Sequence, residues 1–151
     1  MKLNYLLIIF FVYISMPCRA QSSNFAYHVL KNISFGHQNI AANCFVQDSL
    51  GMIWVGTNNG LYNYDGYTAK SAPIPDKNFK TFIHALLTLD NKYLAVGTGD
   101  GLFIYDYIKD VHEVVGDLAH VDVRSLLLDE DKLWIGTLNG LYVYILEKMY
   151  N

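Results

Sequence analysis

The sequence predicts an all-β fold because one short segment occurs three times along the chain. The copies occupy residues 54–64, 95–105 and 134–144. Their Gly-Thr pairs begin at positions 56, 97 and 136, so consecutive copies are 41 and 39 residues apart. A period of about 40 residues in a strand-rich chain is typical of propeller blades. We therefore expect a partial β-propeller of about three four-stranded antiparallel blades, preceded by a signal peptide.

Each copy has the composition of a β-hairpin. A short apolar strand leads into Gly-Thr, and an Asn-Gly or Asp-Gly dipeptide follows at positions 59–60, 100–101 and 139–140. These dipeptides favour tight reversals because they adopt positive φ angles, and we expect them to occupy the turns. The threonines that precede them should bond to the turn backbone. These threonines are Thr57, Thr98 and Thr137.

The pattern of strands and turns divides the whole chain. The predicted segments are a signal peptide (1–20), a leading strand and linker (21–38), blade 1 (39–76), blade 2 (77–118) and an incomplete blade 3 (119–151). No helix is expected after the leader. Closed propellers have about four to eight blades, so three blades leave open ends. Open ends expose apolar faces and unpaired strand edges, which favour self-association.

The first 20 residues have the pattern of an export signal. Lys2 precedes an almost wholly apolar run at 5–14, and Cys18 and Ala20 fit a small-x-small site with cleavage between Ala20 and Gln21. The run is too short for a comfortable membrane span. We expect a periplasmic or secreted protein that meets a membrane only through an uncleaved leader. Cys44 would then be the only cysteine, without a disulfide, and is expected to be a small core residue.

Composition and spacing exclude several classes of site. The net charge of −3, without a basic run, excludes a nucleic-acid partner. No Gly-rich phosphate loop and no recurring carboxylate pair is present. The histidines have no metal-ligand spacing and are expected at surfaces or blade edges; they are His28, His37, His84, His112 and His120. The acidic run 129–131 is expected to be a solvated loop. We predict no catalytic, cofactor-binding or metal residue, no cofactor, and ligand-binding residues that the sequence leaves unknown.

Aromatic residues recur within the repeat and have two interpretations. They could stack on sugar rings, but their repeated position beside the hairpin favours packing between blades. This group comprises Trp54, Trp134, Tyr62, Tyr64, Tyr105, Tyr142 and Tyr144. Asp48, Gly51 and Trp54 are similar to the Asp-box of sialidase propellers, but the spacing between Asp and Gly is one residue too long.

The first copy with its flanks resembles the two-component regulator propeller repeat. The residues that carry this resemblance are Asp48-Ser49-Leu50-Gly51-Met52-Ile53-Trp54-Val55-Gly56-Thr57-Asn58-Asn59-Gly60-Leu61-Tyr62-Asn63-Tyr64-Asp65-Gly66. Residues 25–36 and 39–47 resemble the start of such sensors after the signal peptide. The resemblance covers residues 25–145 and is weaker in the second copy, where Ala95 replaces the tryptophan.

This repeat builds the periplasmic sensor region of bacterial hybrid two-component systems, which responds to carbohydrate breakdown products and signals to a histidine kinase. The resemblance implies a ligand-sensing segment with an oligosaccharide ligand, and with further propeller blades or a second copy as partners. It implies no enzyme activity, because the chain has no kinase domain. Two alternatives stay open. One is a propeller-type polysaccharide lyase or hydrolase, and the other is a truncated gene product without independent function.

Overall fold

The computed structural model describes residues 30–36, 40–75 and 82–146. The predicted signal peptide, its cleavage site, and residues 21–29 and 37–38 of the predicted leading strand and linker lie outside these ranges. Contacts divide the chain into a first unit, residues 1–31, and a second unit, residues 32–151. The fold of the second unit is all-β and confirms the predicted partial propeller.

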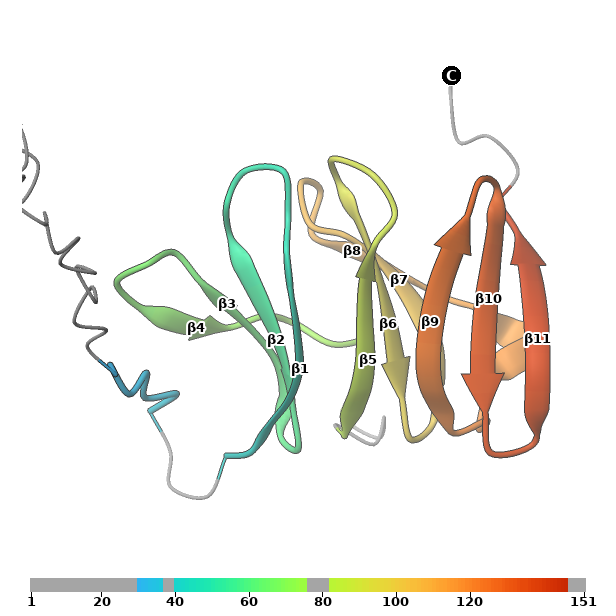
Figure 1. Ribbon diagram of the computed structural model, residues 1–151, viewed down its shortest axis with the longest axis horizontal. Coiled ribbons are helices and arrows are strands. Elements are labelled where there is room, and N and C mark those ends of the chain that lie inside the picture. The colour runs from blue at the N-terminus through green and yellow to red at the C-terminus, as the bar shows by residue number, and fades with distance from the viewer. Residues whose placement is uncertain (1–29, 37–39, 76–81, 147–151) are drawn as a thin grey trace, which may run out of the picture. The chain divides into compact units, whose positions relative to one another are not determined.

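The described residues form three antiparallel sheets, which we call blades 1, 2 and 3 (Figure 1). Blade 1 contains β1 (Ala42–Gln47), β2 (Ile53–Thr57), β3 (Gly60–Tyr64) and β4 (Ala69–Ser71). Blade 2 contains β5 (Ile83–Thr88), β6 (Tyr93–Thr98), β7 (Gly101–Asp106) and β8 (Val111–Val114). Blade 3 contains β9 (Val123–Asp129), β10 (Lys132–Thr137) and β11 (Gly140–Ile145). Each strand pairs with the next one in the chain, as successive hairpins require.

The expectation of a helix-free chain after the leader needs one correction. A short 3₁₀ helix, Gly116–Leu118, follows β8 and places the buried Leu118 against the core. Among the described residues no helix is long and apolar enough to cross a membrane.

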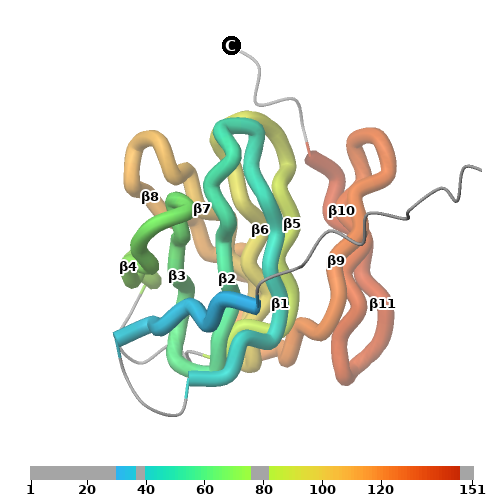
Figure 2. The backbone as a smooth tube through the Cα atoms, turned by 60° about the vertical axis from the view of Figure 1, so that its left-hand side comes forward, coloured from blue at the N-terminus to red at the C-terminus, as the bar shows by residue number. Residues whose placement is uncertain are grey.

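The three blades converge on their first strands, β1, β5 and β9, which we call the inner strands. Neighbouring blades contact each other mainly through these strands, and Figure 2 shows β1 beside β5. Figure 1 labels all three inner strands. Two apolar cores fill the space between blades. The core between blades 1 and 2 includes Trp54, Leu61, Ile83, Val96 and Phe103. The core between blades 2 and 3 includes Ala95, Leu102, Val123, Leu133 and Ile135.

The glycine of each Gly-Thr pair allows close approach of the next inner strand. A Cβ atom at Gly56 would lie 2.5 Å from Cγ2 of Ile83, and one at Gly97 would lie 2.6 Å from Cγ1 of Val123. Both distances are too short for real carbon atoms, so any side chain there would push the next blade away. The repeated glycine is therefore a requirement of blade packing.

The threonine prediction is confirmed in all three hairpins. The hydroxyls of Thr57, Thr98 and Thr137 donate to the carbonyl three residues later at 2.8, 2.9 and 2.9 Å. The same hydroxyls accept from the backbone N–H two residues later, at 2.9, 3.1 and 3.1 Å.

The position of the turn differs from the prediction by one residue. The two turn residues are Asn58 and Asn59 in blade 1, because Thr57 pairs with Gly60. Gly60 opens β3 with φ of 109°, whereas Asn59 has no positive φ. Within the dipeptide, only the glycine adopts a positive φ angle. This glycine is the first residue of a strand rather than a turn residue.

Packing between blades, as predicted for the aromatic residues, is confirmed for Trp54. Its ring is buried against Tyr105 and Tyr107 of blade 2, with centroids 5.7 and 5.4 Å away. Its indole N–H donates to Oδ2 of Asp48 at 2.9 Å, despite the imperfect Asp-box spacing. The packing prediction is wrong for two tyrosines of blade 3, Tyr142 and Tyr144, which are exposed because no described strand covers β11.

Candidate functional site

Each inner strand contains a β-bulge at the same place. The register of pairing shifts by one residue at Asn43 in β1, at His84 in β5 and at Arg124 in β9. A bulge leaves one residue outside the regular ladder and redirects its side chain. Three bulges at equivalent positions therefore present three polar side chains from neighbouring blades.

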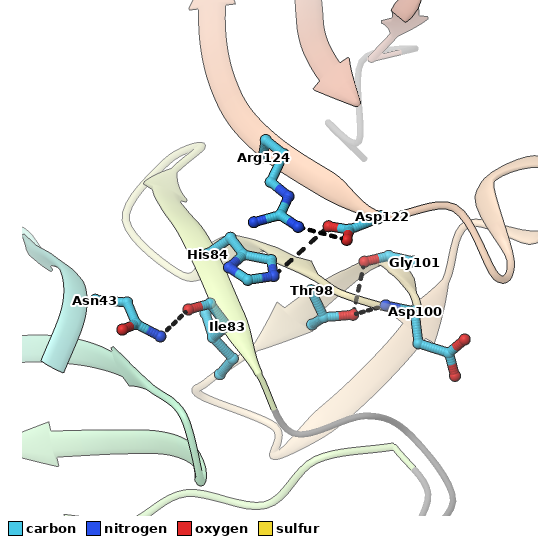
Figure 3. Close-up of polar contacts among 8 residues, drawn as sticks. All are labelled: Asn43, Ile83, His84, Thr98, Asp100, Gly101, Asp122 and Arg124. Carbon is cyan, nitrogen blue, oxygen red and sulfur yellow. Dashed lines mark hydrogen bonds and ion pairs between the residues drawn. The ribbon is translucent and has the colours of Figure 1, made fainter. Parts of the chain in front are cut away.

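The bulge side chains of blades 1 and 2 reach towards the following blade (Figure 3). The amide nitrogen Nδ2 of Asn43 donates to the carbonyl oxygen of Ile83 at 2.9 Å. Nε2 of His84 lies 3.5 Å from Oδ1 of Asp122, which directly precedes β9. Both contacts link one inner strand to the start of the next.

The bulge side chain of blade 3 makes a different contact. Arg124 donates from its guanidinium to Oδ2 of Asp122, two residues earlier, at 2.7 Å, and its side chain is about half exposed. Asp122 therefore stands between His84 and Arg124 and joins the polar groups of blades 2 and 3 (Figure 3).

The hairpin turns between second and third strands lie at the same end of the blades as the bulges. In each blade the backbone N–H of the first turn residue donates to the backbone carbonyl of the residue directly before the inner strand. These bonds are Asn58 to Ala41 at 3.1 Å, Gly99 to Phe82 at 3.0 Å and Leu138 to Asp122 at 3.1 Å. We call this end of the blades the bulge rim; it comprises the three bulge residues, Asp122 and the turns at 58–59, 99–100 and 138–139.

Burial and charge determine the protonation of His84. Burial lowers the pKa of His84, the positive charge of Arg124 lowers it further, and the carboxylate of Asp122 opposes both effects. Neutral imidazole has one donor and one acceptor nitrogen, so it can donate a hydrogen bond to a hydroxyl or accept one from it. Oδ1 of Asp122 is buried and has no hydrogen-bond donor within the described residues. His84 is the imidazole that faces it.

The bulge rim has the groups for binding rather than for covalent chemistry. An amide, an imidazole, a carboxylate and a guanidinium stand at neighbouring positions, and together they donate and accept hydrogen bonds. The one free thiol within the described residues, Cys44, packs against the core, and burial raises its pKa to about 11. A thiol with so high a pKa is a poor nucleophile. The described residues also contain no group of three or more His, Cys, Asp or Glu side chains placed to hold a metal ion.

Sequence reasoning did not identify the bulge residues, although a regularity marks them. Asn43 and His84 each precede the glycine of their Gly-Thr pair by 13 residues, and Arg124 precedes its glycine by 12. The prediction that histidines lie at surfaces or blade edges fits two of them. His112 on β8 stacks on Tyr105 at 4.6 Å, and His120 is exposed beside Asp100. It misses His84, which lies between blades, while His28 and His37 lie outside the described residues.

Comparisons with known proteins agree with this architecture. The family model described as two component regulator propeller matches residues 34–59, which include β1, β2 and the first hairpin turn. The extracellular domain of a putative hybrid two component system from B. thetaiotaomicron is 40% identical, with a TM-score of 0.71. That alignment covers 80% of this chain and 16% of the solved one. Residues 34–59 therefore contain a two-component regulator propeller repeat.

A second solved structure and one curated protein are also similar to this chain. The second structure is of the same B. thetaiotaomicron protein, described there as the extracellular domain of a putative one component system, and it matches with the same identity, TM-score and coverage. A histidine kinase from Formosa agariphila is 35% identical over 63 residues, which is 42% of this chain and 4% of that protein. The chain thus spans a small part of the relatives that it matches. It resembles the extracellular sensor domain of a hybrid two-component system and matches no kinase domain in these proteins.

Proposed function

We propose that this chain is a ligand-sensing propeller segment that works outside the cytoplasm and binds an oligosaccharide at the bulge rim. The observation that carries the proposal is the bulge that recurs in all three inner strands. Each copy directs a hydrogen-bonding side chain to the end of the blades where the hairpin turns also lie. Bulges are often found beside binding and active sites because they redirect side chains.

The chemistry of the rim suits a hydroxyl-rich ligand that carries a carboxylate. Asn43 and neutral His84 both donate and accept, as sugar hydroxyls do. Arg124 has an exposed guanidinium whose parallel N–H groups match the geometry of a carboxylate. Among saccharides, an acidic oligosaccharide would use all three groups.

Location and lack of enzymatic activity belong to the same proposal. The apolar leader with a small-x-small site supports export, and the similar solved structures are extracellular domains. Binding without turnover is supported by the composition of the rim, where no nucleophile stands beside a base. Turnover of a polysaccharide by the purified protein would instead favour the lyase or hydrolase alternative.

The test is titration calorimetry of the purified protein with neutral and uronic acid oligosaccharides. We expect the acidic ligands to bind, and we expect Arg124→Ala to weaken that binding about tenfold, since a charge-assisted bond contributes about 1.5 kcal/mol or more. Asn43→Ala should weaken the binding of neutral and acidic oligosaccharides equally. Lys132→Ala is the matched control because Lys132 is exposed at the opposite end of blade 3. Equal losses for Lys132→Ala and Arg124→Ala, or no binding at all, would contradict the proposal.

A further inference from the structure

Phe82 is an exposed aromatic residue at the bulge rim. It directly precedes β5, and its backbone carbonyl accepts the N–H of Gly99 in the hairpin turn at 3.0 Å. The cores between blades do not cover it, because 48% of the residue is exposed. Small-molecule sites combine aromatic side chains with a few well-placed polar groups. Phe82 adds the aromatic part to a rim that otherwise offers polar side chains.

The ring of Phe82 begins a row of four side chains that runs from blade 2 to blade 3. Its centroid lies 5.6 Å from that of the His84 ring, with the two planes tilted by 38°. Nε2 of His84 lies 3.5 Å from Oδ1 of Asp122. The other oxygen of Asp122 accepts from Arg124 at 2.7 Å, and Figure 3 shows these last three side chains together. The row therefore has an apolar group at one end and an exposed guanidinium at the other.

The first turn residue of blade 2 has no side chain that could cover this aromatic end of the row. Asn58 and Leu138 are the first turn residues of blades 1 and 3, whereas blade 2 has Gly99. A Cβ atom at Gly99 would lie 3.6 Å from Nε2 of His84 and 4.0 Å from Cβ of Phe82. Any side chain at this position would thus begin in contact with both residues. Gly99 does not have a positive φ, so the backbone of the turn does not require a glycine.

The aromatic group occurs in one of the three blades. The residues equivalent to Phe82, each directly before an inner strand, are Ala41 in blade 1 and Asp122 in blade 3. The bulge residues of the same two blades are Asn43 and Arg124. Within the described blades, the rim therefore offers an apolar ligand surface one place to bind, and that place is in blade 2.

We propose that Phe82 is the stacking platform for one pyranose ring of the bound oligosaccharide. A pyranose ring has C–H groups on its faces and hydroxyls around its edge. The faces gain dispersion contacts with an aromatic ring, and the hydroxyls need a group that donates and accepts, such as His84. Gly99 leaves the platform uncovered, and Arg124 at the far end of the row takes a carboxylate. The inference rests on the function proposed above, because it locates one ring of the same ligand.

The experiment is calorimetry of the purified full chain with the same neutral and uronic acid oligosaccharides. Phe82→Ala should weaken the binding of both classes about tenfold, because about 50 Å² of apolar contact would be lost. Arg124→Ala should instead weaken the acidic class selectively. Phe82→Tyr keeps a flat ring and should bind as the wild-type protein does. Tyr67→Ala is the matched control, since Tyr67 is 88% exposed in the turn between β3 and β4, at the opposite end of blade 1.

A substitution at Gly99 tests the platform without changing Phe82 itself. Gly99→Leu carries the residue of blade 3 and would cover Phe82 and His84. We expect it to weaken binding about as much as Phe82→Ala does. The urea midpoint of unfolding should stay at the wild-type value, because the new Cβ atom meets its neighbours at ordinary contact distances.

Proton NMR of the ligand distinguishes stacking from general apolar contact. Protons held over the face of an aromatic ring shift upfield, so ring C–H protons of the bound sugar should shift upfield with the wild-type protein and with Phe82→Tyr. Phe82→Leu keeps an apolar side chain but has no aromatic ring, and the shift should be lost.

Three outcomes would overturn the inference alone. They are wild-type affinity of Phe82→Ala, an equal loss for Tyr67→Ala, or sugar protons without an upfield shift on binding. The proposed function would stand in these cases if Arg124→Ala and Asn43→Ala still weakened binding. A wild-type protein that binds no oligosaccharide would overturn both proposals.

Discussion

Strands β7 and β11 have nearly the same sequence and opposite environments. β7 reads Gly-Leu-Phe-Ile-Tyr-Asp and β11 reads Gly-Leu-Tyr-Val-Tyr-Ile. Both follow the same threonine-stabilised turn and pair with the second strand of their blade in the same register. Every residue of β7 is buried, and every residue of β11 is exposed.

The difference arises from neighbours and not from the strands themselves. β7 has β8 along its edge, and blades 1 and 3 cover its two faces. β11 pairs with β10, and no other described strand pairs with it. Repeat proteins gain much of their stability from contacts between units, so equal sequences contribute unequally along the array. Substitutions at matched positions of blades 2 and 3 should therefore have very different effects.

The largest contrast is expected for a leucine-to-alanine change in these two strands. Leu102→Ala should lower the free energy of unfolding by about 2–5 kcal/mol, since it opens a cavity in a fully buried site. Leu141→Ala should change it by less than about 0.5 kcal/mol, because Leu141 is exposed. Urea unfolding followed by tryptophan fluorescence measures both. Equal losses for the two variants would contradict the difference in burial between Leu102 and Leu141.

A second contrast concerns the aspartate before the second strand. Asp48 is buried and accepts hydrogen bonds from the N–H groups of Leu50 and Met52 and from the indole of Trp54. Asp48→Ala leaves three donors without their acceptor, so we expect a loss of about 3 kcal/mol at about 1 kcal/mol for each bond. Asp129 holds the equivalent place in blade 3 and is exposed. Asp129→Ala should unfold at the same urea concentration as the wild-type protein.

A third contrast concerns the glycine of the Gly-Thr pair. Gly97→Ala should cost about 1–3 kcal/mol, because the new methyl group would clash with Val123 of blade 3. The new methyl group of Gly136→Ala would meet only atoms of Ser125, and the nearest of these is the hydroxyl. A hydroxyl can rotate away, so the loss should be smaller. Thermal unfolding by calorimetry compares the two.

A double variant identifies the cause of this third effect. Val123→Ala combined with Gly97→Ala should recover part of the loss relative to the sum of the single variants, since the truncated side chain makes room for the methyl group. Strict additivity would show that the glycine serves the backbone of β6 rather than the approach of the next blade.

Local chemistry explains why the hairpins and the fold class could be predicted from the sequence. The contacts of Thr57 and the positive φ of Gly60 depend on residues within one turn, so a repeated short pattern is enough to reveal them. The place of the turn was missed by one residue, because the glycine of an Asn-Gly pair can either be a turn residue or open the strand that follows the turn.

The bulge rim and the exposure of blade 3 depend on partners that are distant in sequence. His84 acquires its role from a shift of pairing between β5 and β6 and from Asp122 on the next blade. Neither feature is visible in the residues around position 84. Likewise Tyr142 and Tyr144 look like packing residues, since the residues aligned with them are buried in blade 2, yet their exposed fractions are 40% and 39%.

The smallest expected effect is a pH dependence at the bulge rim. Burial and Arg124 hold the pKa of His84 below its ordinary value, so the unfolded chain takes up a proton first as the pH falls through about 6.5. Stability should therefore decline from that pH downwards until the folded-state pKa of His84 is passed. The stability of His84→Asn, which carries the bulge residue of blade 1, should decline less over the same pH range than that of the wild-type protein.

His120→Asn is the control for this prediction, because it removes one exposed histidine from the same end of the blades. Urea midpoints at a series of pH values measure the slopes, and a slope for His84→Asn as steep as that of the wild type would show that the imidazole is not held neutral between the blades.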